Sequence, residues 1–125
     1  MHCPACKSAM IILEYNQIEI DFCPSCNGIW LDQGEFELML GLPAQAFDLS
    51  LLKKAQKSRR RCPRCRKKMK RDLFPQTKVE VDFCPGDGGL WLDKGELQQI
   101  AQVEGNKSLS ENLKKYFNDL LNTNS

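Results

Sequence analysis

The chain carries one unit twice, and each unit holds paired cysteines at both ends of a hairpin-length insert. Residues 19–35 and 80–96, which lie 61 positions apart, are identical at 11 of 17 aligned positions. A Cys-Pro-x-Cys motif precedes each copy, at residues 3–6 and 62–65. Cysteine pairs at this spacing on either side of a hairpin are typical of metal sites. The chain must therefore fold so that distant cysteine pairs meet, once in each unit.

The size of each unit makes a bound metal a condition of folding. A repeat of about 40 residues buries too little apolar surface to offset its conformational entropy without a metal, a disulfide or a partner. Structural zinc contributes roughly 10–16 kcal/mol of apparent folding free energy in small peptides. A metal ion in each repeat would supply the folding free energy that apolar burial does not.

The cysteine count argues against a secreted disulfide scaffold. There are seven cysteines, an odd number, and the amino terminus shows no basic-then-apolar signal segment. No run of 18 apolar residues occurs, so we expect no membrane span. We predict a cytoplasmic protein whose thiolates bind metal in a reducing environment.

The first predicted site consists of Cys3, Cys6, Cys23 and Cys26. Two C-x-x-C pairs supply four soft ligands, and a tetrahedral thiolate set selects zinc or, failing that, iron. Four sulfur ligands leave no coordination position for water, so we expect this site to be structural.

The second predicted site consists of Cys62, Cys65, Cys84 and Asp87, because Asp87 stands where the first repeat has a cysteine. Aspartate is a legitimate zinc ligand through one oxygen. Two alternatives stay open: three cysteines with a water, which would leave the metal open, or a degenerate motif without metal. We expect two Zn²⁺ ions per chain.

Enzymatic chemistry is the weaker interpretation of these motifs. Hydrolysis at an open metal needs a general acid or base within reach, and the chain's only histidine is His2, beside the first site. Dithiol oxidoreductases also use Cys-Pro-x-Cys, but in a βαβ unit rather than in paired sets at hairpin ends. We predict that the protein is not an enzyme.

The local patterns predict a small metal-stabilised α+β fold. Residues 10–15 and 18–22 are rich in β-forming residues and flank a short turn, which indicates a hairpin. Asp32 and Glu35, with Asp93 and Glu96 as counterparts, have the capping-box spacing that starts a short helix in each repeat. Trp30 and Trp91 lie in matching apolar stretches, so we assign them to the core.

Two further helices are predicted outside the repeats. Pro43 precedes apolar residues at helical spacing, and Ser108 with Glu111 forms another capping-box pattern before a leucine-rich stripe. Both amphipathic helices need an apolar surface, either on the repeats or on another chain. We divide the chain into a first repeat (1–41), a helical linker (42–60), a second repeat (61–101) and a C-terminal amphipathic helix (102–125).

Basic residues concentrate in one segment. Residues 53–71 contain 12 of the 18 lysines and arginines and no acidic residue, whereas residues 1–41 hold one basic and six acidic residues. Such a block is typical of phosphate binding. The predicted nucleic-acid-binding residues are Arg59, Arg60, Arg61, Arg64, Arg66, Lys67 and Lys68. Alternatively, the block docks against the acidic first repeat, within the chain or across a dimer, or it is a solvated face.

The motif order Cys-Pro-x-Cys, hairpin, Cys-Pro-x-Cys-x-Gly-Ile-Trp-Leu-Asp-x-Gly-Glu resembles the transcription factor IIB-type zinc-ribbon family, in two tandem copies. The resemblance covers roughly two thirds of the chain. It implies zinc β-ribbons, each followed by a short helix, with the seven cysteines as ligands. Asp87 departs from the family's usual fourth cysteine.

We therefore interpret the chain as a non-enzymatic tandem zinc-ribbon module. Its basic face is expected to contact nucleic acid or a transcription-type machine such as RNA polymerase. The first alternative is a protein-protein adaptor or homo-oligomer without nucleic-acid binding. The second is a metal-dependent or redox enzyme.

Overall fold

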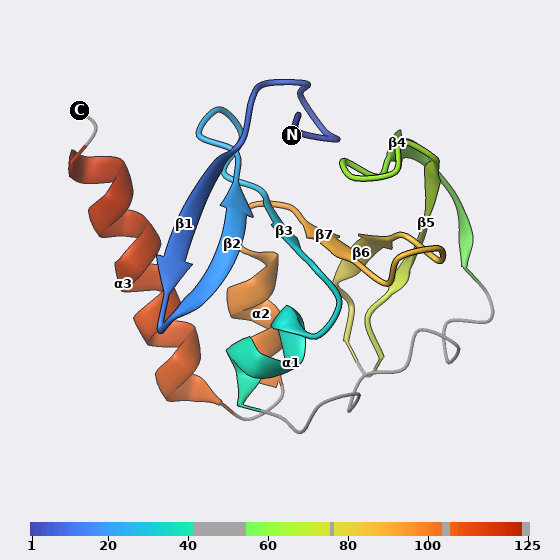
Figure 1. Ribbon diagram of the computed structural model, residues 1–125. Helices are drawn as coiled ribbons and strands as arrows, with labels where there is room; N and C mark the ends of the chain where they lie inside the picture. The colour runs from blue at the N-terminus through green and yellow to red at the C-terminus, as the bar shows by residue number, and fades with distance from the viewer. Residues whose placement is uncertain (42–54, 76, 104–105, 124–125) are drawn as a thin grey trace.

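The two repeats share one antiparallel sheet. The computed structural model describes residues 1–41, 55–75, 77–103 and 106–123 (Figure 1). In this part of the chain seven strands lie in the order β1-β2-β3-β7-β6-β5-β4. The strands are β1 (Ile11–Tyr15), β2 (Ile18–Phe22), β3 (Ile29–Leu31), β4 (Gln56–Arg61), β5 (Lys68–Leu73), β6 (Glu80–Phe83) and β7 (Leu90–Leu92). The helices are α1 (Glu35–Leu40), α2 (Glu96–Val103) and α3 (Lys107–Thr123). The predicted α+β fold of metal-stabilised ribbons with helices is confirmed.

Each repeat begins with the predicted hairpin. In the first repeat, Tyr15 pairs with Ile18 across a two-residue turn. Both turn residues, Asn16 and Gln17, have positive φ values of 49° and 66°. This is the conformation of a type I′ turn, whose twist matches that of the flanking strands. The hairpin returns the chain to its starting end, where the two cysteine pairs of the repeat lie.

The repeats join through short third strands that the sequence patterns did not predict. In the antiparallel pairing of β3 with β7, Trp30 lies opposite Trp91, Ile29 opposite Leu92 and Leu31 opposite Leu90. Trp30 and Trp91 occupy equivalent positions of the two repeats. The junction is therefore a local twofold arrangement, in which each repeat presents the same strand to the other.

Apolar side chains occupy both faces of this sheet. Ile29 and Leu31 belong to the larger core, which also includes Phe36 of α1, Leu97 of α2 and Leu113 of α3. The residue between them in the strand, Trp30, belongs to a second cluster with Trp91, Met69 and four buried cysteines. Both tryptophans are fully buried, so their predicted place in the core is confirmed.

The tryptophans cross the junction reciprocally. A Cβ atom on Gly28 would lie 2.3 Å from the ring of Trp91, and one on Gly89 would lie 2.0 Å from the ring of Trp30. These separations are far below van der Waals contact. Each indole thus packs on the backbone of the other repeat, where only glycine leaves room.

Helix α3 packs on the first repeat. The rings of Phe117 and Phe22 stack with centroids 5.8 Å apart. The ring of Tyr116 lies 5.1 Å from that of Tyr15, and its hydroxyl donates a hydrogen bond to the carbonyl of Glu14 at the sheet edge (3.2 Å). The apolar stripe of this helix is therefore covered within the chain.

Some boundaries differ from the sequence-based expectations. Residues 56–60, which we assigned to a helical linker, form most of strand β4, because β5 offers an open edge that pairs with them. Residues 42–54, the rest of that predicted linker, lie outside the described residues. The side chain of Asn106 accepts the Leu109 N–H (3.1 Å) at the start of α3, the capping role that we expected from Ser108.

The reciprocal indole packing predicts a strong steric requirement. Gly28→Ala and Gly89→Ala should each lower the free energy of unfolding by about 1–3 kcal/mol, because the added methyl overpacks the junction. The matched control is Gly86→Ser, since a Cβ added at Gly86 makes only an ordinary van der Waals contact, 3.7 Å from the Cys84 Sγ, and the first repeat has serine at this place. Urea denaturation of the zinc-loaded proteins measures the difference. Equal stability of Gly28→Ala and Gly86→Ser would contradict the packing argument.

Candidate metal centres

Four turns of the same construction position the candidate ligands. In each turn the carbonyl of the first cysteine accepts the N–H of the fourth residue after it, and the cysteine N–H donates to the carbonyl of the fifth. The fourth residue has a positive φ in all four turns. These residues are Lys7 (φ 69°), Asn27 (64°), Arg66 (66°) and Gly88 (77°). The turn at residues 84–89 keeps this construction although it lacks a second cysteine.

The first cluster has the dimensions of a four-thiolate site. The Sγ atoms of Cys6 and Cys23 lie 3.4 Å apart, and those of Cys3 and Cys26 lie 3.6 Å apart. Four sulfurs at about 2.3 Å from a zinc ion stand about 3.8 Å from one another in a tetrahedron, whereas a disulfide needs about 2.05 Å. All seven cysteines are free. The structure thus brings together the four sulfurs that the sequence predicts as one ligand set.

Backbone N–H groups point at one of the two buried sulfurs of each site. The Cys3 Sγ accepts bonds from the N–H groups of Ala5 and Cys6 (both 3.3 Å), and the Cys62 Sγ accepts from Arg64 and Cys65 (both 3.4 Å). Burial nevertheless raises the pKa of the Cys3 and Cys62 thiols well above the ordinary value. A bound cation supplies the positive charge that such buried thiolates need.

The second cluster places Asp87 where its counterpart places a cysteine. The ligand atoms of Cys62, Cys65, Cys84 and Asp87 all lie within 4.8 Å of one another. Oδ2 of Asp87 lies 3.1 Å from the Cys62 Sγ, while Oδ1 accepts the Gly89 N–H (3.0 Å). One carboxylate oxygen therefore points into the cluster and the other is held by the turn. This geometry fits three thiolates and one oxygen.

A carboxylate after each buried tryptophan links the core to the basic segment. The Trp30 indole N–H donates to Asp32 (2.9 Å), and the Trp91 indole N–H donates to Asp93 (3.1 Å). Arg64 of the second repeat binds Asp32 of the first.

The predicted capping box at Asp32 and Glu35 forms only in part. Glu35 accepts the Asp32 N–H (2.7 Å), while the Asp32 carboxylate binds the indole and the arginine. Sequence reasoning missed this role, for which the repeated Trp-Leu-Asp was the available signal.

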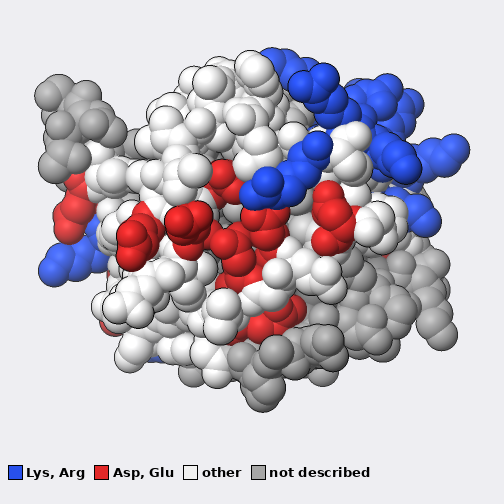
Figure 2. All heavy atoms as spheres, in the orientation of Figure 1, with Lys and Arg blue, Asp and Glu red and all other residues white. Residues whose placement is uncertain are grey.

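The predicted basic surface divides into two groups. Arg64 pairs with Asp32 and lies 3.8 Å from Asp21, and Arg60 pairs with Asp82 (3.0 Å) and Asp93 (2.8 Å). Arg64 therefore contacts the acidic first repeat, as the docking alternative expected for the whole block, whereas Arg60 binds carboxylates of the second repeat. The other five residues of the predicted set are exposed. They are Arg59, Arg61, Arg66, Lys67 and Lys68. Figure 2 shows basic side chains gathered beside β4 and β5, with acidic side chains across the middle of the same face.

Paired four-ligand clusters at the ends of joined β-ribbons define a tandem zinc ribbon. The chain belongs to the transcription factor zinc-finger family of TFIIB-type zinc ribbons, whose pattern matches residues 2–40 and 61–103. No curated protein and no solved structure matches the chain. Each cluster fits one Zn²⁺ ion, which makes two per chain. Within the described ranges, no helix has the length and apolar character needed to cross a membrane.

Glu96, next to the second repeat's Asp93, should make folding pH-dependent. Burial raises its pKa from 4.5 to about 7, opposed by a hydrogen bond from the Asp93 N–H (2.6 Å). The folded state therefore binds this proton more tightly than the unfolded chain, so stability from this group is lost as pH rises from about 4.5 to about 7. Glu96→Gln keeps the accepting oxygen without the titration. The unfolding free energy of Glu96→Gln minus that of the wild type should therefore increase from about pH 6 to about pH 8.

Urea denaturation of the zinc-loaded proteins at the two pH values tests this expectation. The control is Glu111→Gln, because Glu111 is exposed on α3. A constant difference between Glu96→Gln and wild type at both pH values would contradict the raised pKa.

Proposed function

We propose that the protein is a non-enzymatic zinc-ribbon module that binds the phosphate backbone of nucleic acid through the basic edge formed by β4, β5 and the turn between them. Cys3, Cys6, Cys23 and Cys26 hold the first zinc ion, and Cys62, Cys65, Cys84 and Asp87 hold the second. The free thiols fit the reducing cytoplasm, where we place the protein.

The ligand sets support a structural role for both metals. Four protein donors complete a tetrahedral zinc site and leave no position for a reacting water. Both clusters combine two buried ligands with one exposed and one half-buried ligand, so they are closed on the core side. The second metal then holds the turn between β4 and β5, which is part of the basic edge.

The observation that carries the nucleic-acid proposal is the pairing of like charges across β4 and β5. Lys57 lies opposite Lys70, and Arg61 lies opposite Lys68. Like charges directly opposite each other destabilise an antiparallel pair by a few tenths of a kcal/mol or more. An anionic partner would relieve this repulsion. Phosphates along a nucleic-acid backbone supply negative charges at regular spacing, and binding them releases counterions.

The composition of this edge favours backbone contacts over base recognition. No aromatic residue lies between Phe47 and Phe74 in the sequence, so the segment offers no stacking platform. Phosphate contacts position a protein but carry little sequence information. The module would therefore bind nucleic acid with weak sequence preference, or would raise the affinity of a larger transcription machine for nucleic acid.

A protein-protein adaptor is the second candidate function. Arg64 and Arg60 already use part of the basic segment for contacts inside the chain. The outer strand β1 exposes Ile11 (45%) and Ile12 (67%), which could meet another chain. This candidate expects self-association or capture of a protein, with no affinity for nucleic acid at low salt.

The carboxylate ligand should make the second site the weaker one. Native mass spectrometry should find two zinc ions per chain, and stepwise chelation should remove the ion of the second site first, because a carboxylate replaces a thiolate there. Asp87→Cys should slow that loss. The reciprocal change, Cys26→Asp, should make the first site similarly labile. Unchanged zinc release from both variants would exclude Asp87 as a ligand.

Salt dependence tests the nucleic-acid proposal. The logarithm of the binding constant for duplex DNA should fall with the logarithm of salt concentration by about 0.9 for each phosphate contacted. Neutralising Arg59, Arg61, Arg66, Lys67 and Lys68 together should flatten this slope while both zinc ions stay bound. The matched control neutralises Lys78, Lys107 and Lys115, which are exposed elsewhere. The measurement is binding to a fluorescent oligonucleotide. No binding by the wild type at low salt would overturn the proposal, and so would equal binding by the two neutralised variants.

A further inference from the structure

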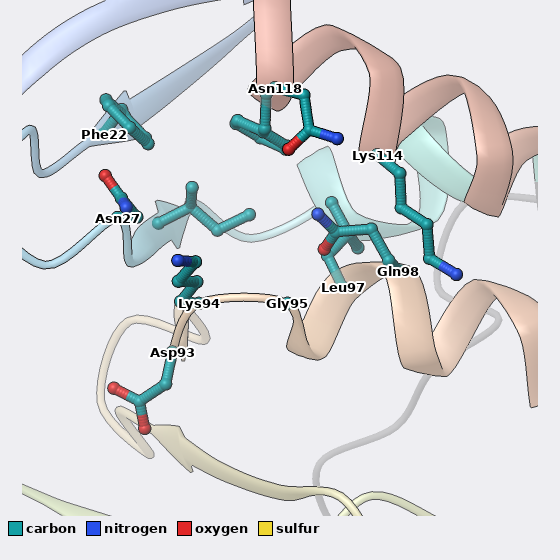
Figure 3. A pocket seen from close by; sticks show the side chains of 11 residues that line it. Phe22, Asn27, Asp93, Lys94, Gly95, Leu97, Gln98, Lys114 and Asn118 are labelled. Carbon is teal, nitrogen blue, oxygen red and sulfur yellow. The ribbon is translucent and has the colours of Figure 1, made fainter. Parts of the chain in front are cut away.

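Two hollows of the molecule differ in chemical character. The pocket in Figure 3 lies between the first repeat and helices α2 and α3, with Phe22 and Leu97 in its wall, and the Lys114 ammonium points out of it. By contrast, a groove of 470 Å³ lies between the first cysteine turns of the two repeats, at residues 1–7 and 61–66. We call it the turn groove. Four lysine and arginine side chains line it and, within the described ranges, no acidic one does, so its charge favours an anionic partner.

Equivalent residues of the two repeats stand on either side of this groove. Lys7 of the first repeat corresponds to Arg66 of the second, and both hold the positive-φ place of their turn. His2 corresponds to Arg61 in the same way. All four residues are exposed and line the groove. In Figure 1 the N-terminal turn faces the turn between β4 and β5. Cations of both repeats therefore meet whatever lies between these turns.

Three of the four cations have no carboxylate partner. The ion pairs among the described residues leave out Lys7, Arg61 and Arg66. The Nη1 group of Arg61 donates to the Arg66 carbonyl (3.1 Å). Arg64 is the exception, because it binds Asp32 and so ties the second turn to the first repeat. The groove is thus preformed, with three charges available to a ligand.

We propose that the turn groove binds one unpaired strand of nucleic acid. This inference rests on the proposed function and narrows its ligand from nucleic acid in general to single strands. A strand that runs between the turns meets Lys7 on one side and Arg61 and Arg66 on the other. A duplex is too wide to enter a groove of 470 Å³ and can only lie across its rim. A positively charged groove that follows the backbone is a common means of binding single strands without sequence preference.

The groove also offers an aromatic ring to an unpaired base. His2 is exposed in the lining, and its main chain forms a β-bridge with Ala9. An unpaired base can stack on an imidazole ring, whereas the bases of a duplex stay stacked on one another. One such contact raises affinity about fivefold or more. His2 therefore favours the single strand over the duplex.

The test compares two ligands on the full zinc-loaded chain: fluorescent oligothymidylate, and the same strand annealed to oligodeoxyadenylate. The single strand should bind about fivefold more tightly than the duplex at the same salt concentration, and His2→Ala should remove this preference. Lys7→Asn should lower the salt slope for the single strand by about 0.7, the contribution of one phosphate contact, without changing duplex binding. Asparagine suits this place, because Asn27 has the same positive-φ conformation in the next turn.

Two control variants isolate the groove. Lys7→Arg keeps the charge and should bind as wild type, and so should Lys94→Gln, which removes an exposed charge outside the groove. Native mass spectrometry should find two zinc ions in every variant. Equal affinity for both ligands, or an unchanged single-strand slope in Lys7→Asn, would overturn the groove proposal. The proposed function would still stand if neutralising the basic edge weakened duplex binding. No binding of either ligand would overturn both proposals.

Discussion

The fold depends on the two four-ligand clusters, because the turns that carry the ligands have little else to hold them together. The outer cysteines Cys6 and Cys65 are exposed, and the turns around them, residues 3–8 and 62–67, contribute only cysteine to the core clusters. Coordination of the buried and exposed ligands by one ion ties each pair of turns at the hairpin ends. The hairpins then present β2 and β6 in the register that places the third strands and tryptophans at the junction.

The arrangement of charge follows from that junction. Asp21 lies opposite Trp30 in the sheet, and Asp82 lies opposite Trp91, so the acidic residues line the face on which the indoles are buried. Both acidic groups attract arginines from the second repeat. Arg64 reaches across to the first repeat, while Arg60 and Arg71 bind Asp82. The basic segment therefore has two roles in the structure: some arginines satisfy buried carboxylates, and the rest remain at the edge.

The sequence predicted the elements that depend on local spacing. Cysteine spacing identified the clusters, including the place of Asp87, and the β-forming residues on either side of a short turn identified the first hairpin. The predicted helical linker was wrong at residues 56–60, which form most of strand β4. This Lys- and Arg-rich run has no apolar alternation, and its strand conformation depends on pairing with β5. The three-residue strands β3 and β7 are too short to show a period. The position of α3 was unpredictable because it places Phe117 beside Phe22, a contact between residues far apart in sequence.

The pairing of β3 with β7 is the kind of contact that two identical subunits make across a symmetry axis, with the same residues on both sides. Here a single polypeptide supplies both sides. Assembly of the continuous sheet is therefore unimolecular and does not weaken on dilution, unlike that of an obligate homodimer. A tandem chain can also place different residues at equivalent positions, which a symmetric dimer cannot do. Aspartate in one metal cluster, the additional strand β4 on one edge and α3 against one hairpin are three such differences, and they give the two outer edges of one sheet separate chemical characters.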